Sequence, residues 1–200
     1  MKDTREEILI TAFKHFLVQS YGEVTLAHLV KDLNLSKGAF YHHFKSKQEL
    51  FIEVIDRFVL YYVQIDEVQL DPSKSMMDNL MDLVEISLKV FDNLKEKISP
   101  EADELNYYRL MLEAIKHYPD FTKLVNERHK QEELKYFGKL IENARKKGEI
   151  KDNIDTAMLA ETIQSLLDGI GFNVFFIDEK RDYYKHIKRG FQFFYDLIKI

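Results

Sequence analysis

Apolar side chains recur every three or four residues through the first part of the chain, which is the period of an α-helix with one buried face. The repeat predicts a first helix from about Thr4 to Ser20, and Gly22 suits the left-handed position beyond its end. We expect Thr25 to cap a second helix and Asn34 to make the tight turn after it, because asparagine tolerates a positive φ angle. The predicted buried faces comprise Ile8, Leu9, Ala12, Phe13, Phe16, Leu17, Leu26, Leu29, Val30 and Leu33.

Two helix starts lie close together in the next stretch. Ser36 is a good N-cap, and Ser46 with Glu49 forms an S-x-x-E capping box. Only about two helical turns fit between these starts. In that short helix Phe40 and Phe44 share one face, so the polar side chains between them point elsewhere. The pattern predicts a helix-turn-helix whose last helix buries one side and exposes the other.

Helical periodicity continues to the end of the chain without an alternating strand pattern or an Asn-Gly hairpin signal. Each of the three prolines lies at a predicted helix boundary: Asp71-Pro72 and Ser99-Pro100 as cap and first residue, Tyr118-Pro119 as a break. Lys146-Lys147-Gly148 is typical of a helix C-terminus. The sequence predicts an all-α fold with further helices near 47–69, 72–97, 101–117, 120–147, 155–177 and 181–199.

The composition and charge of the chain limit the classes of protein to which it can belong. The chain has 200 residues, of which 46% are hydrophobic, and no cysteine, so disulfides and thiolate metal sites are excluded. No run approaches 18 apolar residues and the N-terminus lacks a signal-peptide core, so we expect a soluble, cytoplasmic protein. Net charge is −5, but residues 1–50 carry seven basic and six acidic residues, leaving −6 for the remainder. A nonspecific polyanion binder would be far more basic, so binding of nucleic acid would depend on a few contacts doubled by symmetry.

The N-terminal motif resembles that of a known family. The residues that carry the likeness are Gly22, Thr25, Leu29, Leu33 to Gly38, Tyr41, His43-Phe44, Lys47 and Leu50. They resemble the N-terminal domain of the TetR (tetracycline-repressor-like) transcriptional regulators, with Asn34 where the family usually has glycine. The rest of the chain is similar only in its helical organisation.

The resemblance implies an all-α homodimer with two domains. A three-helix helix-turn-helix DNA-binding domain would occupy residues 1–46, and a helical ligand-binding and dimerisation domain residues 47–200. It further implies a repressor that binds a palindromic operator on double-stranded DNA and leaves it when a small apolar effector enters the second domain. Such an effector would tilt the helix that begins at Lys47 and change the separation of the two DNA-reading helices.

Carried over residue by residue, the motif assigns DNA contacts to Thr25, Ser36, Lys37, Gly38, Ala39, Tyr41, His42, His43 and Lys47. Lys37 is the candidate for guanine O6 and N7, and Ala39 for a thymine methyl group. The hydroxyl, imidazole and Lys47 ammonium groups suit phosphate oxygens. Each residue also has an alternative without a DNA contact. Lys37 and Lys47 could simply be solvated, and Tyr41 could pack against the protein. His42 and His43 could be a surface pair or form hydrogen bonds within the protein.

The last two helices carry the candidate dimer surface: Met158, Ile163, Leu166, Leu167, Ile170, Phe191, Phe194 and Leu197. The segment from Asp155 to Gly171 resembles the penultimate helix that builds a four-helix bundle between subunits in the family. An apolar stripe alone does not choose between a partner subunit and the chain's own core, so packing within the subunit remains the alternative.

A candidate ligand pocket comprises Tyr62, Tyr107, Tyr108, Met111, Phe137, Phe172 and Phe176. Aromatic and methionine clusters at helical spacing are more often ordinary core. Arg109, Glu113 and His117 are polar candidates for orienting an effector, but their spacing equally suits a solvated salt-bridge face.

An enzyme and an all-helical adaptor are the two other function classes to be distinguished from a regulator. The chain lacks G-x-S-x-G, a phosphate-binding glycine loop and H-E-x-x-H, and none of its seven histidines follows a glutamate by three residues, so neither an enzyme nor a metal or other cofactor is expected. An all-helical adaptor that binds a peptide or partner helix remains the alternative to a regulator. The adaptor would ignore duplex DNA, whereas a regulator's DNA affinity would fall steeply with salt.

Overall fold

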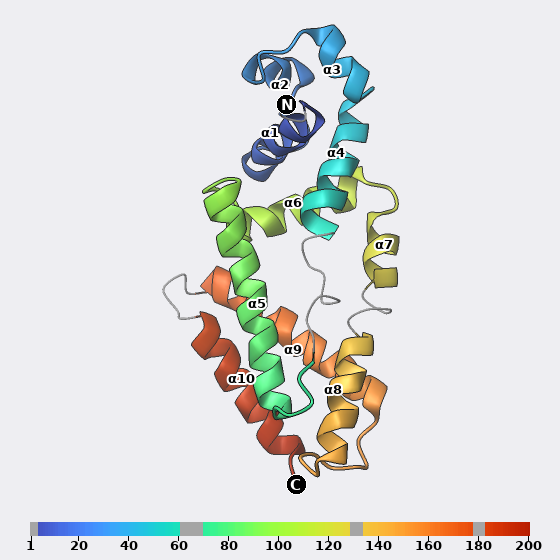
Figure 1. The fold of residues 1–200 in the computed structure, drawn as a ribbon, viewed down its shortest axis with the longest axis vertical. Coiled ribbons are helices and arrows are strands. Elements are labelled where there is room, and N and C mark those ends of the chain that lie inside the picture. Colours follow the sequence, from blue (N-terminus) through green and yellow to red (C-terminus); the bar gives the residue numbers. More distant parts are fainter. Residues whose placement is uncertain (1–3, 61–69, 129–133, 178–182) are drawn as a thin grey trace. The chain divides into compact units, whose positions relative to one another are not determined.

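A computed structural model describes residues 4–60, 70–128, 134–177 and 183–200 of the chain (Figure 1). Over these ranges the regular elements are helices, and an isolated backbone bridge joins Ile150 to Lys199. No strand occurs in the ranges described, which confirms the all-α class predicted from the sequence.

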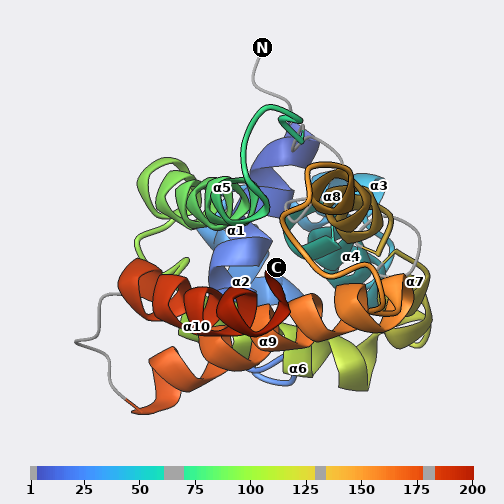
Figure 2. The same cartoon turned by 90° about the horizontal axis from the view of Figure 1, so that it is seen from below.

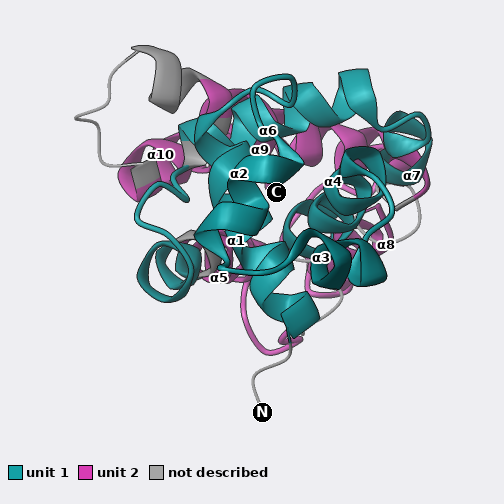
Figure 3. Cartoon of the chain, turned by 90° about the horizontal axis from the view of Figure 1, so that it is seen from above, with its two compact units in different colours: residues 1–63, 89–125 teal, residues 64–88, 126–200 magenta. Residues whose placement is uncertain are grey.

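The chain divides into two compact units (Figure 3). Unit 1 comprises Met1–Val63 and Lys89–Val125, and unit 2 comprises Gln64–Leu88 and Asn126–Ile200. Helix α5, Met76–Lys97, contributes residues to both. This division reflects packing and does not test the functional boundary expected between residues 46 and 47, which stays a prediction.

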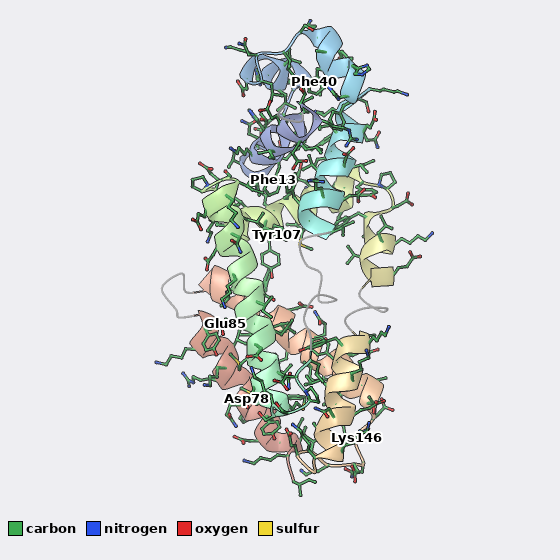
Figure 4. The ribbon with its side chains drawn as sticks, viewed as in Figure 1. Phe13, Phe40, Asp78, Glu85, Tyr107 and Lys146 are labelled. Atoms are coloured by element: carbon green, nitrogen blue, oxygen red, sulfur yellow. The ribbon has the colours of Figure 1, made fainter. Side chains whose placement is uncertain are left out.

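Unit 1 is built on the first helices of the chain. They are α1 (Thr4–Val18), α2 (Leu26–Asp32), α3 (Lys37–His43) and α4 (Lys47–Ile55), which continues into a π-helical turn over Asp56–Leu60. Helix α6 (Glu104–His117) packs against α1 and α4, and α7 (Phe121–Arg128) follows it. Every residue predicted for the apolar face of α1 is buried, including Phe13, which Figure 4 labels together with the buried Phe40 of α3.

The predicted caps of the short helices are confirmed. Ser36 Oγ accepts the Ala39 N–H at 3.1 Å, and Thr25 Oγ1 accepts the His28 N–H at 3.2 Å. Ser46 Oγ accepts the Glu49 N–H at 3.0 Å, but the Glu49 carboxylate reaches back to the N–H of Lys45 at 2.8 Å and not to that of Ser46. Each of the three helices therefore starts where a local side chain satisfies an orphan backbone donor.

The turn between α2 and α3 is closed by Asn34, as the sequence predicts. Its φ angle is +56°, and the N–H of Leu35 donates to the Val30 carbonyl while that of Asn34 donates to Lys31. These two bonds are the Schellman pattern of a helix end. The corresponding expectation for Gly22 is wrong, because α1 already ends at Val18 and Gly22 does not have a positive φ angle.

Two later helices start further along than predicted. Helix α5 begins at Met76, where Ser75 Oγ accepts the Asp78 N–H, and α6 begins at Glu104, where Asp103 accepts the Asn106 N–H. These caps lie three residues beyond the prolines, so neither Pro72 nor Pro100 is a first helical residue. Parts of two further predicted helices, residues 61–69 of 47–69 and residues 129–133 of 120–147, lie outside the described residues.

Unit 2 contains the first part of α5 with α8 (Leu134–Lys146), α9 (Thr156–Ile177) and α10 (Tyr183–Ile198). Helix α9 packs against both α8 and α10 (Figure 2). Gly148 has a φ angle of +68° and ends α8 in the same two-bond pattern, as predicted for Lys146-Lys147-Gly148. The core of the unit includes Phe137, Leu140, Ile141, Ile163, Ile187 and Phe191.

Candidate nucleic-acid interface

Helix α3 has a fully buried side and an exposed side. Phe40, and Phe44 at the C-cap, have no exposed surface and belong to the core of unit 1. On the other side Lys37, Gly38, Ala39, Tyr41 and His42 are exposed, and Tyr41 has 50% of its surface open. The apolar anchors thus leave a continuous set of polar and small side chains facing outward, as the sequence predicts.

The remaining predicted contact residues lie at the edges of this set. Thr25 and Ser36 are exposed at the N-caps of α2 and α3. His43 is partly buried, with its ring 5.4 Å from that of His42. Because each cap oxygen only accepts a bond from its helix, its hydroxyl proton stays available to a further acceptor.

The electrostatic character of this region is moderately positive. Residues 25–47 contain four lysines and one aspartate, so the segment carries +3. Its single acidic side chain, Asp32, lies 2.7 Å from His15 Nε2 on α1. Lys37 Nζ has no hydrogen-bond or ion-pair partner among the residues that the structure describes. The charge of Lys37 is therefore available to an anion or to a base edge.

Lys47 has a role within the protein that the sequence does not reveal. Its ammonium donates to the carbonyl oxygens of Tyr21 at 2.8 Å and Val24 at 2.9 Å. It also lies 4.3 Å from the centroid of the Tyr21 ring. Two of its three N–H groups thus hold the turn between α1 and α2, which corrects the view of Lys47 as a contact residue only. A phosphate contact, which stays a prediction, would use the third.

Helix α6 supplies three residues to the same region. Arg109 donates to the Phe16 carbonyl at 2.8 Å, Glu113 accepts the Tyr21 N–H at 2.7 Å, and the His117 ring stacks on Tyr21 with centroids 4.3 Å apart. The three therefore face the end of α1 and the turn after it. Glu113 also pairs with Lys116 at 3.4 Å and with His117 at 3.9 Å, so the salt-bridge alternative holds in part. The four-residue spacing of Arg109, Glu113 and His117 indicated a shared side of one helix. It could not indicate Phe16 and Tyr21, because these contacts lie far away in the sequence.

The predicted pocket residues divide between the two units. Tyr107, Tyr108 and Met111 lie in unit 1, and Phe137 and Phe172 in unit 2. Tyr62 and the side chain of Phe176 lie outside the described residues. The pocket assignment stays a prediction.

Two of the predicted pocket residues are buried within their own units. Tyr107 is buried, its hydroxyl donates to the Val59 carbonyl at 2.8 Å, and burial raises its pKa well above the usual value. Phe137 is fully enclosed by the core of unit 2. Tyr107 packs within unit 1 and Phe137 within unit 2, as the ordinary-core alternative expects, and their role in a pocket stays a prediction. A shallow surface hollow does occur along α4, but it is lined by Ser46, Gln48, Glu49, Ile52, Glu53 and Asp56 and is acidic.

The candidate dimer surface is also corrected in part. Ile163 and Phe191 are buried in the core of unit 2, so they offer no surface to a partner. Met158 and Leu197 are 64% and 59% exposed, and Phe193, which the sequence analysis missed, is 70% exposed. The other four predicted residues, Leu166, Leu167, Ile170 and Phe194, are partly buried. An apolar stripe did not reveal which of its members face inward.

The chain is similar to known bacterial regulatory proteins. A family model described as bacterial regulatory proteins of the tetR family matches residues 8–54. AcrR of Shigella flexneri, a transcriptional regulator, is 31% identical over 122 residues, which are 60% of this chain and 52% of AcrR. The repressor NemR of Escherichia coli strain K12 is 27% identical over 90 residues, 44% of this chain and 45% of NemR. The matched part of the chain spans about half the length of these two relatives.

The fold agrees over the full length. A protein from Saccharomonospora viridis, described as a transcriptional regulator in complex with choline, superposes with a TM-score of 0.74 at 21% identity and covers 100% of both chains. The family model over residues 8–54 and the curated relatives together indicate a regulator of the TetR family. The curated relatives NemR and AcrR are transcriptional regulators, which agrees with the class predicted from the sequence. Among the described helices, none is long and apolar enough to span a membrane.

Proposed function

We propose that this chain is a transcriptional repressor that binds a palindromic operator as a homodimer. The observation that carries the proposal is the two-sided nature of α3: Phe40 and Phe44 are fully buried, while Lys37, Tyr41 and His42 are exposed. A helix of this kind in a helix-turn-helix enters the major groove and contacts base edges near its N-terminus. The match to the tetR family model supports the same reading.

The chemistry of the exposed side divides the contacts into two kinds. Lys37, at the N-terminus of α3, donates to guanine O6 and N7, and the Ala39 methyl group meets a thymine methyl. Gly38 between them adds no bulk, so the backbone approaches the DNA closely. Phosphate contacts come from Thr25, Ser36, Tyr41, His42, His43 and the third N–H of Lys47.

The modest charge makes symmetry necessary. A net charge of +3 over residues 25–47 neutralises few phosphates, so one subunit binds weakly. Two reading helices about 34 to 36 Å apart fit successive major grooves and double every contact. Met158, Phe193 and Leu197 on α9 and α10 provide exposed apolar area for the partner subunit.

Release by a small apolar effector completes the proposal. The fold is shared with the Saccharomonospora viridis protein, whose structure is described as a complex with choline. Residues 47–200 would hold the effector, and its entry would shift the helix that starts at Lys47. A displacement of a few ångströms suffices, because the helical repeat of DNA fixes the separation that both readers need.

Selection of bound duplexes from a random pool tests the proposal without knowledge of the operator. We expect enrichment of a palindrome whose half-site centres lie about 10 base pairs, or a multiple of one helical turn, apart. Retention should fall steeply as salt rises. Absence of any enriched duplex would contradict the proposal and favour the adaptor alternative.

A further inference from the structure

The turn between α1 and α2 is held from two directions by opposite charges. The backbone N–H of Tyr21 donates to the Glu113 carboxylate on α6 at 2.7 Å, and its carbonyl accepts from the Lys47 ammonium on α4 at 2.8 Å. Bonds to charged groups are about twice as strong as neutral ones. The Tyr21 backbone is therefore fixed relative to both helices, and all three elements lie within unit 1.

The ring of Tyr21 reinforces this arrangement. It stacks on His117 of α6 at 4.3 Å and meets Phe51 of α4 edge-on at 4.9 Å. The Lys47 ammonium lies over the same ring. Tyr21 thus contacts α4 and α6 through its backbone and through its side chain.

Glu113 is placed to act as a charged anchor and not as a solvated surface group. Its side chain is 13% exposed. Burial alone would raise its pKa, but the hydrogen bonds from the Tyr21 backbone and Lys116 and the charges of Lys116 and His117 together hold that pKa below its usual value. The carboxylate is consequently ionised at neutral pH.

The anchored turn leads directly into the helix-turn-helix. Lys47 also holds the Val24 carbonyl at 2.9 Å, and the next residue, Thr25, is the N-cap of α2. Helix α2 packs on α3, and the two hydrogen bonds of the Schellman turn at Asn34 fix the connection between them. Any shift of Tyr21 relative to α4 is therefore passed to the N-terminus of α2 and on to the exposed side of α3.

We propose that Glu113 is a positioning residue for DNA binding: acting through the Tyr21 backbone and opposite Lys47, it sets the angle at which α2 and α3 meet the DNA. The inference rests on the proposed function, but it assigns a role in DNA reading to a residue outside the matched motif at 8–54. Glu113 touches no DNA in this scheme. Its removal misaligns the reading helix and removes no phosphate contact.

The test compares Glu113→Gln and Glu113→Ala with a matched control, Glu96→Gln, an exposed carboxylate of unit 1. Affinity for a duplex selected by the wild-type protein is measured over a salt series, at a temperature where circular dichroism shows every variant folded. We expect Glu113→Ala to weaken binding by about fivefold or more, Glu113→Gln by less because its amide oxygen still accepts from Tyr21, and Glu96→Gln to bind like wild type.

The salt slope separates positioning from contact. Loss of one phosphate contact lowers the slope of log K against log salt by about 0.9, so Glu113 variants should keep the wild-type slope. Folded Glu113→Ala protein that binds with wild-type affinity would overturn the inference, because a purely structural residue changes only the stability. Lys37→Ala is measured alongside. If the wild-type protein selects no duplex, the proposed function fails; if Lys37→Ala weakens binding and Glu113→Ala does not, only the role of Glu113 fails.

Discussion

The Lys47 ammonium donates a hydrogen bond to the backbone carbonyl of Tyr21 at 2.8 Å and lies over the ring of the same residue. Lys47 is the first residue of α4, and Tyr21 lies in the turn after α1. The bond therefore joins the start of α4 to the turn between α1 and α2. Lys47, which is expected to contact a DNA phosphate, thus also stabilises the structure around the DNA-reading helix.

Replacing Lys47 with methionine should therefore affect stability as well as binding. The change leaves the carbonyls of Tyr21 and Val24 without their donor, at a cost of about 1–3 kcal/mol in the free energy of unfolding. Urea denaturation measures this cost. Lys123→Met, at an exposed lysine of α7, is the control and should lie within about 0.5 kcal/mol of wild type. A Lys47→Met protein as stable as this control would contradict the structural role.

Tyr41 and Phe40 are neighbours with opposite expected effects. Tyr41→Ala removes a half-exposed side chain, so the free energy of unfolding should change by about 0.5 kcal/mol or less while DNA binding is strongly reduced. Phe40→Ala opens a cavity in a closed core and should cost about 3–5 kcal/mol. Denaturation and DNA titration of both variants give the comparison, and a Tyr41→Ala protein with full DNA affinity would remove this residue from the interface.

Replacing Asn34 with glycine should destabilise the protein less than replacing it with alanine. Its φ angle of +56° costs an alanine about 1–2 kcal/mol, whereas glycine adopts this angle freely. Thermal unfolding of Asn34→Gly and Asn34→Ala should therefore show a clearly lower midpoint for alanine. Equal midpoints would mean that the turn adopts another conformation.

The ionised Glu113 carboxylate should make the free energy of unfolding depend on pH. Folding lowers the pKa of this carboxyl from its usual 4.5, since the bonds from the Tyr21 backbone and Lys116 outweigh desolvation. Such a group stabilises the fold fully above its usual pKa and loses that effect as the pH falls through the lower folded-state value. The stability difference between wild type and Glu113→Gln should thus be constant near neutral pH and shrink under acid conditions. A difference independent of pH down to the acid limit would show that the charge is not involved.

Local features of the fold could be read from the sequence. The caps at Thr25, Ser36 and Ser46 and the turn at Asn34 depend on residues at most five positions apart, so short-range chemistry determines them. The same holds for Phe40 and Phe44, whose spacing alone places them on one side of a helix. The polar candidates of the DNA-reading helix follow from this, because they are what the buried side leaves exposed.

Contacts between distant segments could not be predicted in this way. Glu113 and Tyr21 lie 92 positions apart, and nothing in the local pattern of either residue indicates the other. The same limit explains Ile163 and Phe191, which belong to apolar stripes but face the core, while the exposed Phe193 was overlooked. The starts of α5 and α6 were misplaced for a different reason, since a competing cap stood three residues after each proline.

The central claim is that the exposed side of α3 reads DNA. The most direct test measures the affinity of the wild-type and Lys37→Ala proteins for a selected duplex and for single-base-pair variants of it. We predict that Lys37→Ala loses about 1–3 kcal/mol of discrimination at one guanine in each half-site and keeps its preference at the other positions. Identical discrimination profiles for the two proteins, or no DNA binding by the wild type, would contradict the account.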